Sequence, residues 1–345
     1  MIHSVGQPIG RSPAREAAVT VRVMTEPRYP ESPWDRVRAA IAADAPATFT
    51  YEELRELAEF GPAQLPFDPD YTNRQGFDET FLGARVPLPA LTADRADDVA
   101  APGVLRYHHF SVLMSRERRF AYYAAANVDG RRRFEQDRAG DRWLVDSRLP
   151  DGQVDNVLYR DNDLDRGHLN RRADMLWGDS LEEALASVAD TFHYTNCVPQ
   201  HARFNQSPIT WHGLEDYLLS KIGDGRLRAN VCTGPVFAAD DPVYRGIRLP
   251  RSFWKVVAVG VEDRVHATAY LLEQTRLLVG LEGTTADEPP LGAYRTYQTA
   301  VTAVEAATGL DFGPLRDVDP YVPPGGPEST ADPRAELKSL GDIVL

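Results

Sequence analysis

The residues of this sequence that are best suited to chemistry form one short string, Asp165-Arg166-Gly167-His168. An imidazole can take a proton from water near neutral pH. A guanidinium can hold a phosphate oxygen through charge-assisted N–H donors, and a glycine lets the backbone turn sharply. We expect Asp165 to have a supporting, structural part, because Asp–Arg pairs at turns commonly form local salt bridges.

Two further blocks follow the string in order. The first is Phe192-His193-Tyr194-Thr195-Asn196-Cys197-Val198-Pro199-Gln200, and the second is Phe204-Asn205-Gln206, followed by Trp211 and by Leu214-Glu215 on a predicted helix. The amide oxygen of Asn205 suits Mg²⁺, a hard cation that prefers oxygen and keeps most of its waters. Glu215 could accept hydrogen bonds from those waters. Asn196 could orient the site or simply close a turn at a strand end, and both readings stay open.

With these three blocks the sequence resembles the DNA/RNA non-specific endonucleases, the family that includes mitochondrial endonuclease G and secreted bacterial nucleases. Further similar motifs lie downstream, at Thr233-Gly234-Pro235-Val236-Phe237, at Leu249-Pro250 with Phe253-Trp254-Lys255-Val256-Val257, and at Thr308-Gly309-Leu310-Asp311-Phe312. The resemblance covers roughly residues 104–315. It departs from the family between Asn205 and Trp211, where the step to the helix is longer than usual, and we expect a helix start at Pro208 to absorb the difference.

The resemblance implies a ββα-metal nuclease fold and a site in which His168 is the general base that activates water. It implies that Asn205 binds Mg²⁺, for which Mn²⁺ can substitute, and that Glu215 and Arg166 assist. A second arginine that contacts the phosphate is expected upstream of the string. Arg142 is the best candidate for it, and Arg131, Arg132 and Arg133 are the competitors. The resemblance also implies 5′-phosphate products and, often, a homodimer.

The elements that must position these residues predict an α+β fold with a central antiparallel sheet flanked by helices. Strands are expected at 109–114, 120–127, 192–198, 231–237, 254–261 and 266–272. Helices are expected at 34–43 and 50–60, from a capping box at Ser180 towards 189, from Ser207-Pro208, and over 294–308 with Gly309 as its end. Residues 1–103 read as an N-terminal helical and extended segment, 104–316 as the nuclease domain, and 317–345 as a loose acidic tail.

Composition narrows the function further. The net charge is −13, but residues 1–103 and 281–345 hold the whole acidic excess, so the stretch with the candidate site can still face phosphate. Lys221, Lys255 and Lys338 are the only lysines, so most phosphate contacts would be planar and bidentate. Two cysteines, Cys197 and Cys232, exclude a disulfide framework and a CxxC metal site. His193, His201 and His212 are better explained by packing or surface roles than by a zinc site.

A secretory signal or a membrane-spanning segment in the sequence would determine location and membrane contact. The first 20 residues contain no apolar core of a secretory signal, and no stretch approaches the roughly 20 apolar residues of a membrane span, so we expect a cytoplasmic protein with no membrane partner. The leading hypothesis is an Mg²⁺-dependent endonuclease of weak sequence preference that acts on DNA or RNA. The alternatives are a nucleic-acid-binding or regulatory protein with a degenerate site, an immunity effector nuclease activated by a partner, and a small-molecule phosphodiesterase.

We expect residues 1–100, or a partner that binds them, to restrain or recruit the nuclease, because a non-specific nuclease without an export signal threatens its own genome. Deleting residues 1–60 is therefore expected to change activity, assembly or partner binding. Plasmid cleavage, size-exclusion chromatography and pull-down would measure the three properties. No change in any of them would remove the hypothesis.

Overall fold

The computed structural model describes residues 68–135, 142–205, 220, 222, 227–261, 264–280, 295–323 and 334–337. Residues 63–345 cluster as one compact unit. Glu215, Trp211, His212 and the helices expected at 34–43, at 50–60 and from Ser207 lie outside the described residues. None of the helices within these ranges is long and apolar enough to cross a membrane.

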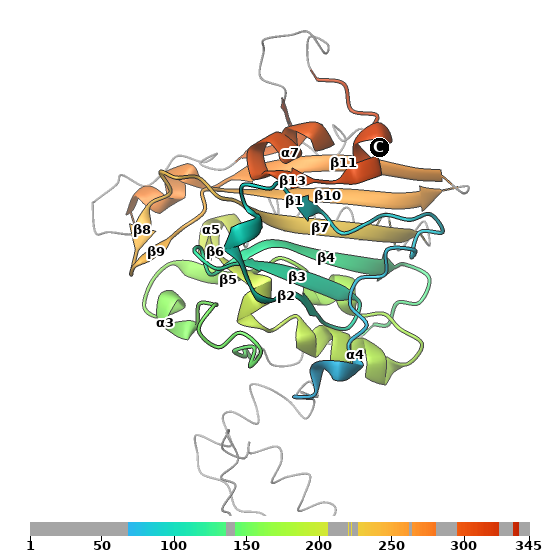
Figure 1. The fold of residues 1–345 in the computed structure, drawn as a ribbon, viewed down its shortest axis with the longest axis horizontal. Coiled ribbons are helices and arrows are strands. Elements are labelled where there is room, and N and C mark those ends of the chain that lie inside the picture. Colours follow the sequence, from blue (N-terminus) through green and yellow to red (C-terminus); the bar gives the residue numbers. More distant parts are fainter. Residues whose placement is uncertain are drawn as a thin grey trace, which may run out of the picture. The chain divides into compact units, whose positions relative to one another are not determined.

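An antiparallel sheet of eight strands forms the centre of the described chain, in the order β14-β12-β11-β10-β7-β4-β3-β2 (Figure 1). Its strands are β2 Val99–Arg106, β3 Phe110–Ser115, β4 Ala121–Asp129, β7 Arg228–Val236, β10 Ser252–Val261, β11 Arg264–Glu273, β12 Arg295–Thr299 and β14 Ala335–Glu336. Every neighbouring pair in the sheet is antiparallel. The predicted α+β class with a central antiparallel sheet is confirmed.

The central strands are apolar along most of their length because both faces of the sheet are covered. Every residue of β3 and β4 is buried, as are residues 253–258 of β10. The edge strand β2 instead mixes buried and exposed positions, and Val104 in it is 41% exposed. The strands expected at 109–114, 120–127, 231–237, 254–261 and 266–272 are confirmed, with ends that shift by at most three residues.

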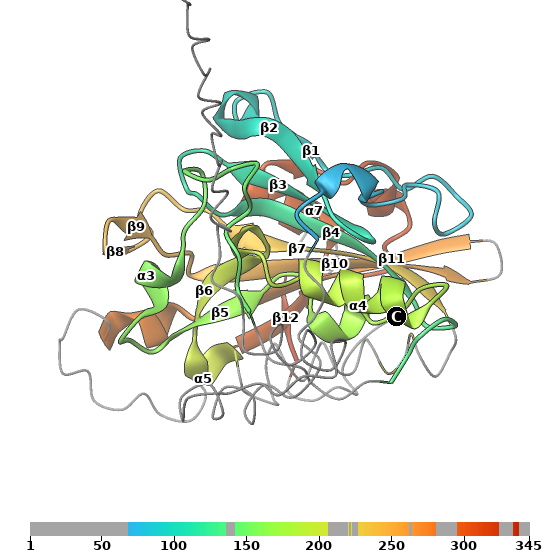
Figure 2. The same cartoon turned by 90° about the horizontal axis from the view of Figure 1, so that it is seen from below.

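One face of the sheet carries the elements that hold the candidate site (Figure 2). They are α3 Asn156–Tyr159, β5 Leu164–His168, α4 Leu181–Asp190, β6 Cys197–His201 and α5 Ala202–Asn205. Their apolar side chains share a single core with the sheet. Val188 of α4, Val198 of β6 and Phe204 of α5 all belong to it, and the Phe204 ring lies 5.5 Å from that of Phe253 on β10.

A second core covers the opposite face. It includes Val301 and Val304 of α7 (Val301–Thr308), and the ring of buried Trp254 on β10 meets Phe312 edge-on at 5.3 Å. The short strands β1 (Ala90–Leu91) and β13 (Leu310–Asp311) pair beside this layer. The remaining elements are the hairpin β8 Val243–Tyr244 with β9 Ile247–Arg248, and 3-10 turns at Tyr71–Asn73, Ala96–Asp98, Arg172–Met175, Tyr194–Asn196, Thr275–Gly280 and Gly313–Asp317.

Two helix signals in the sequence work as predicted. The Ser180 hydroxyl accepts a hydrogen bond from the Glu183 amide at 3.1 Å, so Ser180 caps α4 as predicted. The Glu183 carboxylate reaches back to the Asp179 amide at 2.7 Å, one residue before the position it takes in a regular capping box. Gly309 has a φ of 68°, and its amide donates to the Glu305 carbonyl at 2.9 Å. A glycine ends α7 because this left-handed conformation costs other residues energy.

Two predicted elements are wrong in extent. The helix expected over 294–308 is helical only at Val301–Thr308, because residues 295–299 complete the hydrogen bonds of β11 as strand β12. The strand expected over 192–198 begins only at Cys197, after a 3-10 turn. Strand β2 runs across the domain boundary expected at residue 103, and Ala335–Glu336 of the expected tail pairs with β12.

Gln274, directly after β11, ties β6 to the main sheet. Its amide nitrogen donates to the carbonyls of Pro199 at 3.1 Å and Pro250 at 2.9 Å, and its amide oxygen accepts from the His201 backbone amide at 2.9 Å. The Gln274 side chain is fully buried. It therefore satisfies three backbone groups that the packing of β6 against the sheet removes from water.

Replacing Gln274 with Met keeps the shape of the side chain but leaves those three backbone groups without their partner. We expect the free energy of unfolding to fall by roughly 2–4 kcal/mol, measured by urea denaturation. A loss below about 0.5 kcal/mol, within the range of ordinary surface substitutions, would contradict this role of Gln274.

Candidate active site

The string Asp165-Arg166-Gly167-His168 forms most of strand β5, which pairs with β6 as a separate two-stranded sheet. Helix α5 follows β6 without a gap, and Asn205 is its last described residue. The string and Asn205 thus belong to one β-β-α unit. Successive side chains of a strand point to opposite faces, so Arg166 and His168 share one face of β5, and Asp165 and Gly167 share the other.

Two aromatic rings pack against the His168 imidazole. The ring of Trp143 lies 4.7 Å away at a tilt of 47°, and that of Phe192 lies 5.0 Å away in a perpendicular arrangement. Contacts on two sides restrict the rotation of the imidazole. They also separate it partly from solvent, and the whole His168 residue is half-buried.

The Arg166 guanidinium is held beside the same tryptophan. Its Nη1 donates to the Asn156 Oδ1 at 2.7 Å, and its central carbon lies 5.6 Å from the Trp143 ring centre. Asn156 begins α3, which the Asp155 side chain caps by accepting from the Val157 amide. Burial raises the pKa of Tyr194, and the nearby Arg166 charge partly offsets this rise. Trp143 therefore lies against both candidate groups on this face of β5, His168 and Arg166.

Asn205 is joined to β5 by a hydrogen bond to Asp165. The Asn205 amide nitrogen donates to the Asp165 Oδ2 at 3.0 Å. A carboxylate only accepts hydrogen bonds, so this contact requires the nitrogen of the amide to face Asp165. The carbonyl oxygen of Asn205 is then the atom that it can offer to a metal ion.

Asn196 clamps the chain directly after the string. Its side-chain oxygen accepts from the Asn170 amide at 3.0 Å, and its side-chain nitrogen donates to the carbonyls of Asn170 and Thr191, each at 2.9 Å. The Asn196 carbonyl also accepts from the Leu169 amide at 2.9 Å. Asn196 is fully buried. Asn196 thus ends the 3-10 turn before β6 and also holds the chain after the string, so both readings stay predictions.

Gln200 is a candidate site residue that the sequence reasoning quoted but did not assign. Its side chain is fully buried against Gly167, where a Cβ would lie 2.2 Å from the Gln200 Oε1. Neither polar atom of its amide finds a hydrogen-bond partner among the described residues. Buried amides are generally hydrogen-bonded, to protein groups or to ordered water. The sequence signal that could have found it is its place at the end of the second block.

The donor chemistry near Asn205 fits a hydrated hard cation. The amide oxygen of Asn205 is the kind of ligand that Mg²⁺ prefers, and the adjacent Asp165 carboxylate adds negative charge. The described residues contain no group of three or more His, Cys, Asp or Glu side chains able to hold a metal. Mg²⁺ usually keeps several of its waters in protein sites, and Glu215, expected to bind them, lies outside the described residues.

The other predicted residues are placed as follows. Arg142 is exposed and immediately precedes Trp143, the ring that packs on His168. Its competitors Arg131 and Arg132 are both paired with the buried carboxylate of Asp129. The third competitor, Arg133, is exposed like Arg142, so the choice of Arg142 stays a prediction.

The sequence predicts packing or surface roles, and no zinc site, for three histidines. Two of them, His193 and His201, are described, and their surroundings differ. His193 is fully buried and hydrogen-bonded through both ring nitrogens. His201 is half-buried, and its Nδ1 accepts from the Arg203 amide at 3.2 Å.

Comparison with known families identifies the family of this chain. Residues 93–318 match the family described as DNA/RNA non-specific endonuclease. The chain belongs to this family. The match contains the string on β5, the second block and Asn205, so the residues placed together above lie within the family's span.

Several proteins are similar to this member of the family. Uncharacterized protein y4fB of Sinorhizobium fredii is 36% identical over 70% of this chain and 39% of its own length. A nuclease of Nostoc sp. is 28% identical over 53% of this chain and 62% of its own. Human mitochondrial endonuclease G is 31% identical over 51% of this chain and 58% of its own. The chain thus spans less than two thirds of the length of each of these relatives.

A solved structure is also similar. It is the crystal structure of the EndoG/EndoGI complex, with a TM-score of 0.45 and 18% identity over 61% of this chain and 84% of that one.

Gly167→Ala places a methyl group where the buried Gln200 amide lies, 2.2 Å from its Oε1. We expect the free energy of unfolding to fall by about 1–3 kcal/mol, as for other overpacked sites, and expect the double variant with Gln200→Ser to recover part of the loss. Urea denaturation would measure both.

Gly260→Ala on β10 is the matched control, because its nearest contact is the Leu82 carbonyl oxygen at 3.2 Å. Equal losses in the two single variants, or no recovery in the double variant, would argue against close packing of Gly167 on Gln200.

Proposed function

We propose that the protein is a divalent-metal-dependent endonuclease that hydrolyses phosphodiester bonds of DNA or RNA with weak sequence preference. Membership of the DNA/RNA non-specific endonuclease family supports this proposal. The observation that carries it is the hydrogen bond between Asp165 and Asn205, which holds a candidate metal ligand against the strand that bears His168.

His168 acts as the general base. Its imidazole accepts a proton from the water that attacks phosphorus, and it later gives the proton back to solvent. The packing of Trp143 and Phe192 supports this role, because a base must hold its orientation relative to the attacked phosphate.

Arg166 and Arg142 bind the phosphate. The hydrogen bond to Asn156 uses one N–H of the Arg166 guanidinium and fixes its plane. A guanidinium that is already oriented loses less freedom when it binds a phosphate oxygen, and it opposes the negative charge that grows there. Arg142, one residue before Trp143, contributes a second positive charge from the exposed side.

Mg²⁺ is the proposed metal, with Mn²⁺ as a substitute. When bound, such an ion stabilises the negative charge of the phosphoryl group and of the leaving 3′-oxygen. Asn205 would hold it through its side-chain carbonyl oxygen, which takes no part in the contact with Asp165. Glu215 would accept hydrogen bonds from the bound waters.

Plasmid DNA incubated with the protein and Mg²⁺ is expected to lose its supercoiled form, and EDTA is expected to stop the reaction. His168→Ala should lower the cleavage rate by about 10²–10⁴-fold, the usual contribution of a general base. Asn205→Ala should raise the metal concentration needed for half-maximal rate. Gel densitometry over time would measure each rate, and the same assay on single-stranded DNA and on RNA would define the substrate range.

His266→Ala is the matched control, because His266 is an exposed histidine on β11, far along the chain from the string. It should cleave like the wild type. If the wild-type protein leaves DNA and RNA intact with Mg²⁺, Mn²⁺ and other divalent ions, the proposed activity is wrong for the isolated chain. If His168→Ala retains the full rate, His168 is not the base.

A further inference from the structure

The loop from Asp190 to Asn196 contacts His168 and the chain directly after it. Its Phe192 ring packs edge-on against the imidazole at 5.0 Å, and its Asn196 clamps the backbone immediately after the string. The same loop positions the other ring on His168. The Phe192 carbonyl accepts from the Leu144 amide at 2.8 Å, next to Trp143. Both rings around His168 thus depend on where this loop lies.

His193 in this loop is hydrogen-bonded to Tyr71, a residue far earlier in the chain. The His193 Nδ1 lies 2.9 Å from the Asp190 carbonyl oxygen, and its Nε2 lies 2.8 Å from the Tyr71 hydroxyl. A carbonyl oxygen only accepts, so Nδ1 must carry the hydrogen, and the Tyr71 hydroxyl donates to Nε2. His193 is fully buried, and burial lowers its pKa, which favours this neutral form.

Arg74, three residues later, binds the start of the same loop. Its Nε and Nη2 donate to the two oxygens of the Asp190 carboxylate, each at 3.1 Å. Both residues are almost completely buried, with 4% and 1% of their surface exposed. Burial alone would raise the pKa of Asp190, but hydrogen bonds from His108 and from Arg74 hold it below its usual value. Such a desolvated, bidentate pair fixes geometry strongly.

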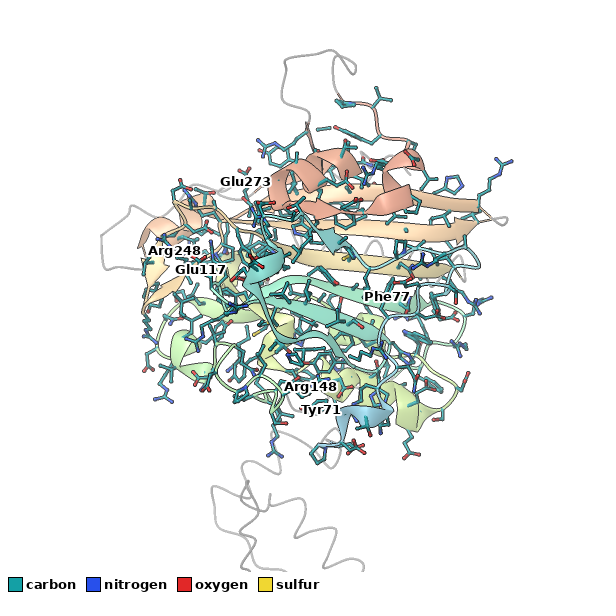
Figure 3. All side chains as sticks on the ribbon, viewed as in Figure 1. Tyr71, Phe77, Glu117, Arg148, Arg248 and Glu273 are labelled. Carbon is teal, nitrogen blue, oxygen red and sulfur yellow. The ribbon has the colours of Figure 1, made fainter. Side chains whose placement is uncertain are left out.

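A second buried pair locks Tyr71 in place. The Arg148 guanidinium lies 4.0 Å from the centre of the Tyr71 ring and 4.7 Å from that of Tyr107, and it donates to the fully buried Asp146 carboxylate at 2.7 Å. Figure 3 labels Tyr71 and Arg148, which lie next to each other. The Tyr107 hydroxyl in turn lies 2.6 Å from that of Thr195, the neighbour of Asn196 in the loop.

We propose that Tyr71 and Arg74 are positioning residues of the active site. They act through His193 and Asp190 to hold the Asp190–Asn196 loop, and through that loop they set the orientation of His168. Both residues precede position 93, where the match to the family begins. The inference rests on the proposed function, in which His168 is the base. A displacement of a catalytic group by about 1 Å can cost a large part of the rate. Residues that hold the Asp190–Asn196 loop can therefore affect the cleavage rate without touching the substrate.

Tyr71→Phe is the sharpest test, because it removes only the hydroxyl that donates to His193. We expect kcat for DNA cleavage to fall by roughly 3- to 10-fold, the effect of one lost hydrogen bond, with KM unchanged, because the phosphate contacts stay in place. The His168 ring resonance in a ¹H–¹³C spectrum, assigned with His168→Ala, should also shift. Arg74→Lys, which keeps the charge but loses the bidentate geometry, should reproduce both effects.

Tyr297→Phe is the matched control, because it removes a hydroxyl from a buried tyrosine on β12. It should leave kcat and the His168 resonance as in the wild type. If Tyr71→Phe and Arg74→Lys lower only the melting temperature, while kcat and the His168 resonance stay unchanged, the two residues are structural and the inference fails. If the wild-type protein cleaves nothing, the proposed function fails. The His168 resonance alone then still decides whether Tyr71 and Arg74 position His168.

Discussion

The pairing of β5 with β6 is the interaction on which the candidate site depends. These two strands lie apart from the eight-stranded sheet, so the hydrogen bonds of that sheet do not hold them. Side chains do so instead. Gln274 ties β6 to the sheet, and Asn196 ties the end of β5 to the turn before β6. Gly167 lets the buried Gln200 approach β5 closely. The site is therefore as rigid as these buried polar contacts make it.

Arginines bound to buried carboxylates hold the loops around the candidate site in place. The carboxylates of Asp146 and Asp190 are almost fully removed from water, and each is bound by an arginine, Arg148 and Arg74 respectively. A buried ion pair adds little net stability because desolvation is costly, but it tolerates few alternative geometries. Such a pair therefore fixes the position of the loop that carries it, as Arg74 does for the Asp190–Asn196 loop. These two arginines are thus bound to carboxylates, whereas Arg166 lies beside the Trp143 ring that packs on His168.

Local signals in the sequence were sufficient for several elements. The capping box at Ser180 and the glycine at 309 act within one turn of a helix, so no distant residue is needed to read them. The apolar runs of β4 and β10 are long enough to identify strands covered on both faces. The expected helix over 294–308 failed at its start for the opposite reason. Residues 295–299 become a strand because β11 offers unpaired backbone groups at its edge, and β11 lies more than twenty residues earlier in the chain.

The sequence by itself determined the family, the fold class and the short list of candidate residues, because spacing within the three blocks is a property of the chain alone. Only the tertiary structure decided which atoms meet. The contact between Asp165 and Asn205, the two rings on His168 and the fully buried Gln200 join residues far apart in sequence. The link from Tyr71 and Arg74 to His193 and Asp190 spans more than a hundred residues and has no local signature. Such contacts arise from the packing of the whole fold, and no local pattern specifies them.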